Sequence, residues 1–158
     1  MLRKPIQLTL LFVFSLQLLF SQKTNTNFID KFLPVAKNLS KDYGMPVSII
    51  LGVSILESGS GTSINCKQLH NYFGVTGKNS LKKRRTMYKQ YEKPEDSFTD
   101  FCKIISRKRF YIKLKNNDNY SLWLQEMNKA NYASAKDIWV SRVKGIITKH
   151  KLFIFDKG

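Results

Sequence analysis

The sequence predicts a mainly α-helical domain with a small irregular or β-hairpin lobe over a cleft. The stretch from Val47 to Gly61 leaves no polar face on a helix, so we expect a central helix that is buried on every side. Apolar residues recur at helical intervals in the segments around it. Residues 61–91 lack this periodicity and contain Gly74 and Gly77 among aromatic and basic residues. We interpret them as a short helical turn followed by the lobe.

The first helix is expected between Asn27 and Tyr43, with Gly44 as its end. Its apolar positions have helical spacing: Phe28, Phe32, Val35, Ala36, Leu39 and Tyr43. Pro34 conflicts with a regular helix because proline lacks an amide hydrogen. It either kinks the helix or lies in the first turn of a shorter one that follows a half-turn. Pro46 then suits the first turn of the central helix.

Three further helices are expected in the C-terminal half. The first runs from Lys93 to Arg109, where acids at the start and bases at the end complement the helix dipole. The apolar stripes of the three helices are more typical of a core than of a ligand surface: Phe98, Phe101, Cys102 and Ile105; Tyr120, Trp123, Leu124 and Met127; Trp139, Val143, Ile146 and Ile147. A polar turn is expected at residues 116–119, and the apolar tail from Leu152 to Phe155 should fold back onto the core.

Glu57 is the one acid at the end of the central apolar segment. A carboxyl group among apolar side chains, near the negative end of a helix dipole, should have a raised pKa and remain protonated near neutral pH. A general acid needs this property. The small residues that follow, Ser58 to Gly61, tolerate left-handed backbone and allow a bulky ligand to approach. The alternative is that Glu57 only caps the core helix in an ion pair.

The N-terminal stretch, residues 1–21, is typical of a secretory signal peptide. Arg3 and Lys4 precede an apolar run that is shorter and more polar than a bilayer-spanning helix, and Ser21 is a plausible cleavage point. An uncleaved anchor is the alternative. The expected organisation is therefore a signal peptide, a short linker at 22–27 and one domain at 28–157. The protein is then secreted or periplasmic.

The composition is strongly basic. The chain has 27 Lys and Arg residues against 11 acids, and its net charge is +16. Anionic polymers are therefore expected partners, and export favours a cell-wall glycan over nucleic acid. The only two cysteines, Cys66 and Cys102, have no metal-site spacing, and whether they pair in an oxidising compartment stays open. We expect no metal and no cofactor.

Four stretches occur in a recognisable order: Ile55–Gly61 (ILESGSG), Asn71–Val75 (NYFGV), Tyr91–Phe101 with Ser97 and Asp100, and Ala130–Ala133 (ANYA). In order and spacing, over residues 28–156, they resemble the glucosaminidase domain of glycoside hydrolase family 73. This family comprises peptidoglycan hydrolases that include flagellar and autolysin-type enzymes. No one of the stretches is specific alone, whereas their combination is.

The resemblance implies a lysozyme-like fold and hydrolysis of the β-1,4 bond after N-acetylglucosamine in peptidoglycan. Glu57 would be the general acid, and Tyr132 the cleft tyrosine that orients the substrate or its N-acetyl group. Asn71 and Phe73 would shape the floor between the lobes and, together with Gly74, Ser60 and Gly61, would bind substrate. The alternative for Tyr132 is a structural role at the start of a helix.

The sequence departs from the family pattern in its second acid. No Asp or Glu lies between Glu57 and Glu92, although glycosidases that use two carboxylates need a partner across the sugar ring. Glu92 is the favoured partner because it closes the lobe. The other nearby acids, Glu95, Asp96 and Asp100, are better explained as helix-start or packing residues. Alternatively, the acetamido group of the substrate attacks the anomeric carbon itself.

Other functions stay open. The domain could be a catalytically inactive wall-binding module, or a lytic transglycosylase, which also uses a single acid. A cationic protein that acts on membranes or nucleic acid fits less well. The basic run 82–85 is either a solvated loop or a cleft rim that attracts peptide carboxylates. The expected partner is the peptidoglycan glycan strand, with no nucleic acid, no stable membrane insertion after signal removal, and a monomeric state.

Overall fold

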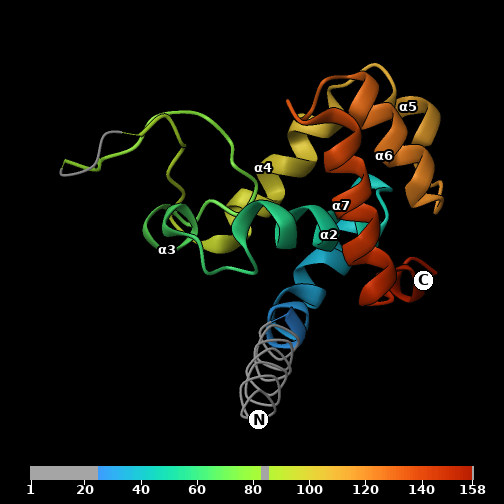
Figure 1. Cartoon of the computed structure of the whole chain (residues 1–158), viewed down its shortest axis with the longest axis horizontal. Helices are drawn as coiled ribbons and strands as arrows, with labels where there is room; N and C mark the ends of the chain where they lie inside the picture. Colours follow the sequence, from blue (N-terminus) through green and yellow to red (C-terminus); the bar gives the residue numbers. More distant parts are fainter. Residues whose placement is uncertain (1–24, 83–85, 158) are drawn as a thin grey trace, which may run out of the picture.

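Helix α2 (Val47–Ser58) lies at the centre of the molecule (Figure 1). Every residue from Val47 to Ile55 is buried, as expected for a helix without a polar face. The helix begins directly after Pro46 and ends at Gly59, which adopts a left-handed conformation with φ of 57°. The computed structural model describes residues 25–82 and 86–157.

The other elements surround α2. A helix over residues 25–43 precedes it. The elements after it are α3 (Ile64–Leu69), α4 (Pro94–Ser106), α5 (Tyr111–Leu114), α6 (Tyr120–Lys129), α7 (Lys136–Lys149) and the 3-10 helix η1 (Leu152–Phe155). In the described ranges, β structure is limited to one isolated antiparallel bridge. The predicted mainly helical fold class is therefore confirmed.

The N-terminal helix differs from expectation in two ways. It runs through Pro34 without interruption, so the predicted alternative of a shorter helix is wrong. Residues 25–27, which fall within the predicted linker, are helical and belong to it. The predicted signal peptide and the first part of the predicted linker lie outside the described residues.

Helix α4 begins and packs as predicted, but it ends early. The Asp96 carboxylate accepts a hydrogen bond from the Lys93 amide at 3.3 Å and caps the first turn. The helix ends at Ser106, and Lys108 lies beyond it. Its predicted inward stripe is fully buried: Phe98, Phe101, Cys102 and Ile105. The early end matters because it turns Lys108 toward the cleft described below.

Helix α7 packs directly against α2 at Gly52. A Cβ atom at Gly52 would lie only 2.8 Å from Cγ1 of Ile147 and 3.3 Å from Cγ1 of Val143. The glycine therefore allows an approach of the two helices that a larger residue would prevent. The C-terminal tail folds back as predicted, since Leu152 is fully buried and the Asp156 carboxylate accepts hydrogen bonds from the backbone and hydroxyl of Ser48.

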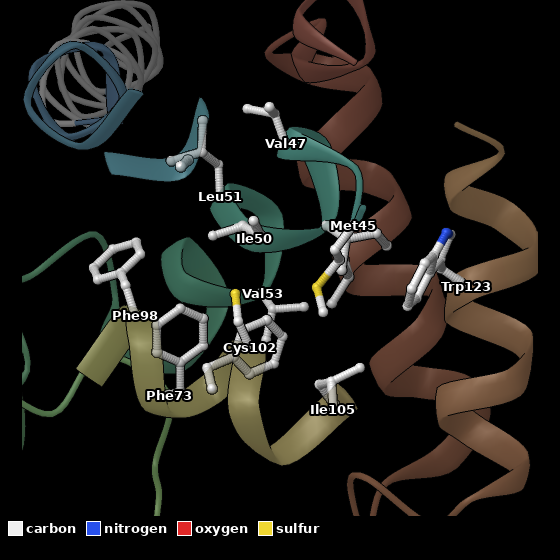
Figure 2. Packing of buried hydrophobic residues seen from close by; sticks show 14 of the residues in the cluster. Met45, Val47, Ile50, Leu51, Val53, Phe73, Phe98, Cys102, Ile105 and Trp123 are labelled. Carbon is white, nitrogen blue, oxygen red and sulfur yellow. The ribbon is translucent and has the colours of Figure 1, made fainter. Parts of the chain in front are cut away.

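Apolar side chains from α2, α4 and α6 meet in one core (Figure 2). Phe73, from the lobe, joins this core by stacking on Phe101 of α4 at a centroid distance of 4.2 Å. Cys102 lies inside it, and Cys66 is buried in α3. Both cysteines are free thiols. The question left open by the sequence is thus answered, because the two do not pair.

The lobe extends from the body between α3 and α4 (Figure 1). Thr76 and Tyr88 form its antiparallel bridge. Asn71 organises its base: the side-chain amide donates to the carbonyls of Val75 and Lys89, both at 2.8 Å, and its oxygen accepts from two backbone amides. The predicted irregular lobe is therefore held together by these side-chain contacts and by a few backbone hydrogen bonds, such as those from the Gly77 amide to the Met87 carbonyl and from the Lys89 amide to the Val75 carbonyl, both at 2.8 Å. Across the described part of the chain, no helix is long and apolar enough to cross a membrane.

Candidate active site

Glu57 is the penultimate residue of α2, where the apolar helix meets the lobe. Its Oε1 atom accepts a hydrogen bond of 2.8 Å from the indole nitrogen of Trp139 on α7. Its Oε2 atom lies toward Gly74, since a Cβ atom placed there would be 3.7 Å away. Both described ion pairs involve other acids. The predicted alternative, an ion-paired cap, is therefore wrong.

Burial raises the pKa of Glu57 above the usual range of a glutamate, and the hydrogen bond from Trp139 opposes part of this rise. The physical cause is the loss of hydration, which penalises the charged carboxylate more than the neutral acid. The site thus keeps a carboxyl group protonated further toward neutral pH than an exposed one. It can act as a proton donor.

A cavity of about 450 Å³ opens in front of Glu57. Its walls come from the lobe, from the end of α4 and from the segment after α6. The lining residues are Glu57, Phe73, Gly74, Val75, Thr76, Ile104, Lys108, Asn131, Tyr132, Ala133 and Ser134. The cavity is open on one side and has the volume of a small-ligand cleft.

Tyr132 is held in this cleft by the turn that ends α6. Asn131 takes a left-handed conformation with φ of 53°, which asparagine tolerates better than most residues. The Tyr132 amide then donates to the Met127 carbonyl at 3.0 Å. The ring packs against Trp139 and, edge-on, against Phe101, at centroid distances of 5.1 and 5.9 Å. Burial, followed by the nearby Glu57 charge, raises the pKa of Tyr132 well above that of a free tyrosine.

Three of the predicted substrate-binding residues lie where the cleft meets the lobe. Phe73 and Gly74 line the cleft with Glu57. Asn71 is buried, and both its amide hydrogens and its oxygen are engaged by backbone groups of the lobe. Asn71 therefore shapes the wall from behind and does not present its amide to the cleft.

Ser60 and Gly61 are not brought to the cleft, contrary to the prediction of substrate contact. The Ser60 hydroxyl donates to the side-chain oxygen of Asn25 in the N-terminal helix. A Cβ atom at Gly61 would meet the rings of Phe28 and Tyr72, at 3.4 and 3.7 Å. Both residues form the turn between α2 and α3, which packs against the N-terminal helix instead of facing Glu57.

Glu92 does not face Glu57 either. It lines a separate cavity with Lys78, Asn79, Gln90 and Tyr91. A second catalytic carboxylate must reach the same sugar ring as Glu57. Glu92 lines a different cavity, so the prediction that it is the partner of Glu57 is wrong.

The remaining acids of this region have structural contacts, as predicted. Asp96 caps α4. Asp100 accepts hydrogen bonds from Lys89 at 2.7 Å and from the Tyr91 hydroxyl at 2.8 Å. Among the described residues that line the cleft, Glu57 is the sole acid.

Sequence reasoning missed two residues of the site. The spacing of Trp139 with Val143 and Ile147 predicts a buried core residue, yet its indole reaches Glu57. The sequence predicts Lys108 at the end of a helix, yet it lines the cleft. An indole nitrogen needs a hydrogen-bond acceptor when buried, and this requirement was the available signal for Trp139.

No group of three or more metal-binding side chains occurs in the described ranges. His70 contacts the carbonyls of Tyr91 and Glu92 through Nδ1, at 3.3 and 3.0 Å, which ties the two ends of the lobe together. Of the predicted basic run, residues 83–85 lie outside the described part of the chain.

Three solved structures have the same fold. The catalytic domain of the autolysin Auto from Listeria monocytogenes matches with a TM-score of 0.66 and 22% identity, over 84% of this chain and 88% of that one. The glycoside hydrolase domain of Salmonella typhimurium FlgJ matches with a TM-score of 0.63 and 20% identity, over 80% of this chain and 88% of that one.

An N-acetylmuramoyl-L-alanine amidase from Staphylococcus aureus matches with a TM-score of 0.71 and 22% identity, over 85% of this chain and 44% of that one. At these identities the likenesses bear on the fold alone. They confirm the predicted lysozyme-like helical architecture.

A comparison with curated proteins found no match. The family model for glucosaminidase, described as mannosyl-glycoprotein endo-beta-N-acetylglucosaminidase, matches residues 33–152, which span the helical body, the lobe and the cleft. The chain therefore belongs to the glucosaminidase family and is a glycoside hydrolase of the family 73 type.

Proposed function

We propose that the protein is a peptidoglycan hydrolase that cleaves the β-1,4 bond after N-acetylglucosamine, with Glu57 as its general acid. The observation that carries this proposal is the position of Glu57. The side chain is largely buried, its pKa is raised, and it faces a cleft between the body and the lobe. A protonated acid at the floor of such a cleft suits transfer of a proton to the oxygen that leaves when a glycosidic bond breaks.

The absence of a second acid from the described cleft lining favours a substrate-assisted reaction. Glu57 gives its proton to the bridging oxygen while the bond from that oxygen to the anomeric carbon breaks. The acetamido oxygen of the same sugar bonds to the anomeric carbon in its place. The Glu57 carboxylate then takes a proton from a water molecule, which adds to that carbon and restores the acetamido group. Tyr132, beside Glu57, orients the acetamido group.

The anionic character of peptidoglycan supports this choice of substrate. The protein has a net charge of +16, and Lys108 lines the cleft. Peptide stems carry carboxylates, which such a protein attracts over a Debye length of about 8–10 Å. Action on the wall also requires export, for which the N-terminal signal peptide proposed from the sequence would provide the route.

The decisive experiment is digestion of purified peptidoglycan followed by mass spectrometry. We expect fragments that end in reducing N-acetylglucosamine, and we expect Glu57→Gln to lower their rate of release at least about 10²-fold, the scale of general acid catalysis. Glu126→Gln is the matched control, because Glu126 lies on α6 in an exposed ion pair with Lys129. A Glu57→Gln variant that still cleaves at the parental rate would refute the assignment.

The same digestion separates two alternatives that the lone acid also permits. A lytic transglycosylase releases an anhydro sugar without a reducing end. A catalytically inactive wall-binding module leaves the glycan intact while the protein co-sediments with it. Either product pattern from the parental protein would replace hydrolysis as the function.

A further inference from the structure

The two carboxyl oxygens of Glu57 have different surroundings. Oε1 accepts the hydrogen bond of 2.8 Å from Nε1 of Trp139. Oε2 lies toward Gly74, where a Cβ atom would be 3.7 Å from Oε2 and 3.9 Å from the Tyr88 ring. Because Gly74 and Glu57 both line the cleft, Oε2 is the oxygen on the lobe side.

This asymmetry has a chemical consequence. An indole nitrogen donates a hydrogen bond and cannot accept one. A protonated carboxyl group has one carbonyl oxygen, which is a good acceptor, and one hydroxyl oxygen, which carries the proton. An N–H group directed at Oε1 therefore favours the form in which Oε1 is the carbonyl and Oε2 carries the proton.

We propose that Trp139 is a positioning residue for the glycosidase reaction: it holds Oε1 as an acceptor and so directs the transferable proton of Glu57 to Oε2, toward the substrate. This inference rests on the proposed function, because a general acid must present its proton on the side where the leaving oxygen lies. Trp139 itself does not touch the substrate in this scheme and acts through Glu57.

The protein holds the donor rigidly. Trp139 is 4% exposed, and its ring packs against that of Tyr132. One turn further along α7, Val143 contacts Gly52, where α7 approaches α2 closely. Helix α2 carries Glu57 and α7 carries Trp139. The close packing of the two helices at Gly52 therefore fixes the position of the indole donor relative to the carboxyl acceptor.

The ionisable groups that surround Glu57 come from the other walls. They are Tyr132 after α6, Lys108 after α4, and Tyr88 in the lobe, whose ring lies near Gly74. Within the described part of the chain, none of these three side chains forms a hydrogen bond with either Glu57 oxygen, whereas Trp139 forms one. The indole is therefore the contact that distinguishes Oε1 from Oε2.

The chain offers a matched control within its own core. Its only two tryptophans are Trp139 and Trp123. The Trp123 indole, on α6, also donates a hydrogen bond of 2.8 Å, but to the backbone carbonyl of Asn117. Replacing either tryptophan by phenylalanine removes one indole hydrogen bond from a buried ring, and only one of the two replacements affects Glu57.

The first test uses the unmodified protein. In 15N-labelled protein the chain gives two indole N–H resonances, which the Trp123→Phe variant assigns. We expect the Trp139 resonance to shift with pH as Glu57 ionises, the Trp123 resonance to stay constant through that transition, and Glu57→Gln to abolish the shift. A Trp139 resonance that does not titrate, or that titrates equally in Glu57→Gln, would overturn the proposal.

The second test is kinetic. We expect Trp139→Phe to lower kcat at least about tenfold, the scale of one hydrogen bond to a charged group, with little change in KM. The alkaline limb of its pH profile should move to higher pH, because the carboxylate loses a hydrogen bond that stabilised it. In Trp123→Phe, the alkaline limb should stay at the same pH as in the parental protein. Equal losses in both variants with unchanged pH profiles would reduce Trp139 to a packing residue.

The two tests distinguish a wrong role for Trp139 from a wrong function for the protein. The resonance experiment needs no substrate and no Trp139 variant, so it remains decisive if Trp139→Phe folds poorly. If the parental protein releases no sugar while the Trp139 resonance still follows Glu57, the proposed function is refuted and the placement of the proton on Oε2 still stands.

Discussion

The helical body and the lobe hold their shapes by different means. In the body, α2 is buried along nearly its whole length and α7 packs on it at Gly52. In the lobe, Asn71 and Asn79 donate hydrogen bonds to backbone carbonyls, and a few backbone hydrogen bonds join its two segments. The proposed acid thus stands on the part held by apolar burial, while the opposite wall of the cleft depends on a few polar contacts.

A small polar network connects the two regions. Asp100 of α4 accepts hydrogen bonds from Lys89 and Tyr91 at the end of the lobe. Burial alone would raise the pKa of Asp100, but these two hydrogen bonds and the charges of Lys89 and Lys103 bring it below its ordinary value. The pair with Lys89 is partly exposed, so it contributes little to stability and mainly orients the lobe on α4.

The largest predicted effect comes from breaking the body. Gly52→Val should lower the free energy of unfolding by about 3 kcal/mol, because its side chain would overlap Ile147 at the contact between α2 and α7. Chemical denaturation measures this change. Gly145→Ala, on α7, is the control, since a Cβ atom there would have nothing within 4 Å, and we expect it to stabilise by about 0.5–1 kcal/mol. A Gly52→Val midpoint equal to the parental one would show that the close packing is unimportant.

The second prediction breaks the lobe alone. Asn71→Ala removes hydrogen-bond partners from backbone groups of the lobe. It should lower the free energy of local unfolding of the lobe by about 2 kcal/mol. Hydrogen exchange should become faster at the Phe73 and Val75 amides, which donate to the Asn71 oxygen, while α2 keeps its protection. Activity should fall because the wall that carries Gly74 loosens.

Asn79→Ala provides the comparison, because Asn79 bonds Thr86 and Tyr88 further out in the lobe. It should disturb the cleft less. If Asn71→Ala exposed α2 to exchange as well, the lobe and the body would be one cooperative unit, contrary to the distinction drawn above.

A third, smaller effect concerns the stability of the acid site itself. The pKa of Glu57 is raised in the folded protein, so its contribution to stability is fully present below the unfolded-state pKa of about 4.3 and is lost as pH rises through the folded value. Glu57→Gln removes the charge that burial disfavours. We expect the Tm of the variant to exceed the parental Tm at neutral pH, and the difference to shrink at low pH. An equal difference at all pH values would point to packing instead.

Much of the body follows from sequence periodicity. The complete burial of α2, the stripe of α4 and the returning tail were predicted because each depends on the spacing of apolar residues within one segment. The small residues after Glu57 likewise indicated the left-handed end of α2. The course of the N-terminal helix through Pro34 was not settled, because tertiary packing can override the cost of one missing hydrogen bond.

The site was predicted less completely, since its contacts join distant segments. Glu57 and Tyr132 lie in one cleft as expected. The hydrogen bond between Trp139 and Glu57 spans 82 residues, and a tryptophan at helical spacing looks the same whether it serves the core or an acid. The position of Glu92 in the sequence, at the end of the lobe, predicts a partner for Glu57, but the fold of the lobe places it at another cavity.

The smallest predicted effect is at the rim where the two regions meet. Lys108 lines the cleft just after α4, and Lys108→Gln removes a cation that would attract the carboxylates of peptide stems. For such an exposed charge we expect KM to rise about two- to fivefold at low salt, with little change in kcat. The effect should vanish at high salt. Lys113→Gln has the same net charge but alters α5, away from the cleft lining, so it separates local from general attraction. If both variants raised KM equally, the net charge of the protein, and not the cation in the cleft, would be what draws the glycan.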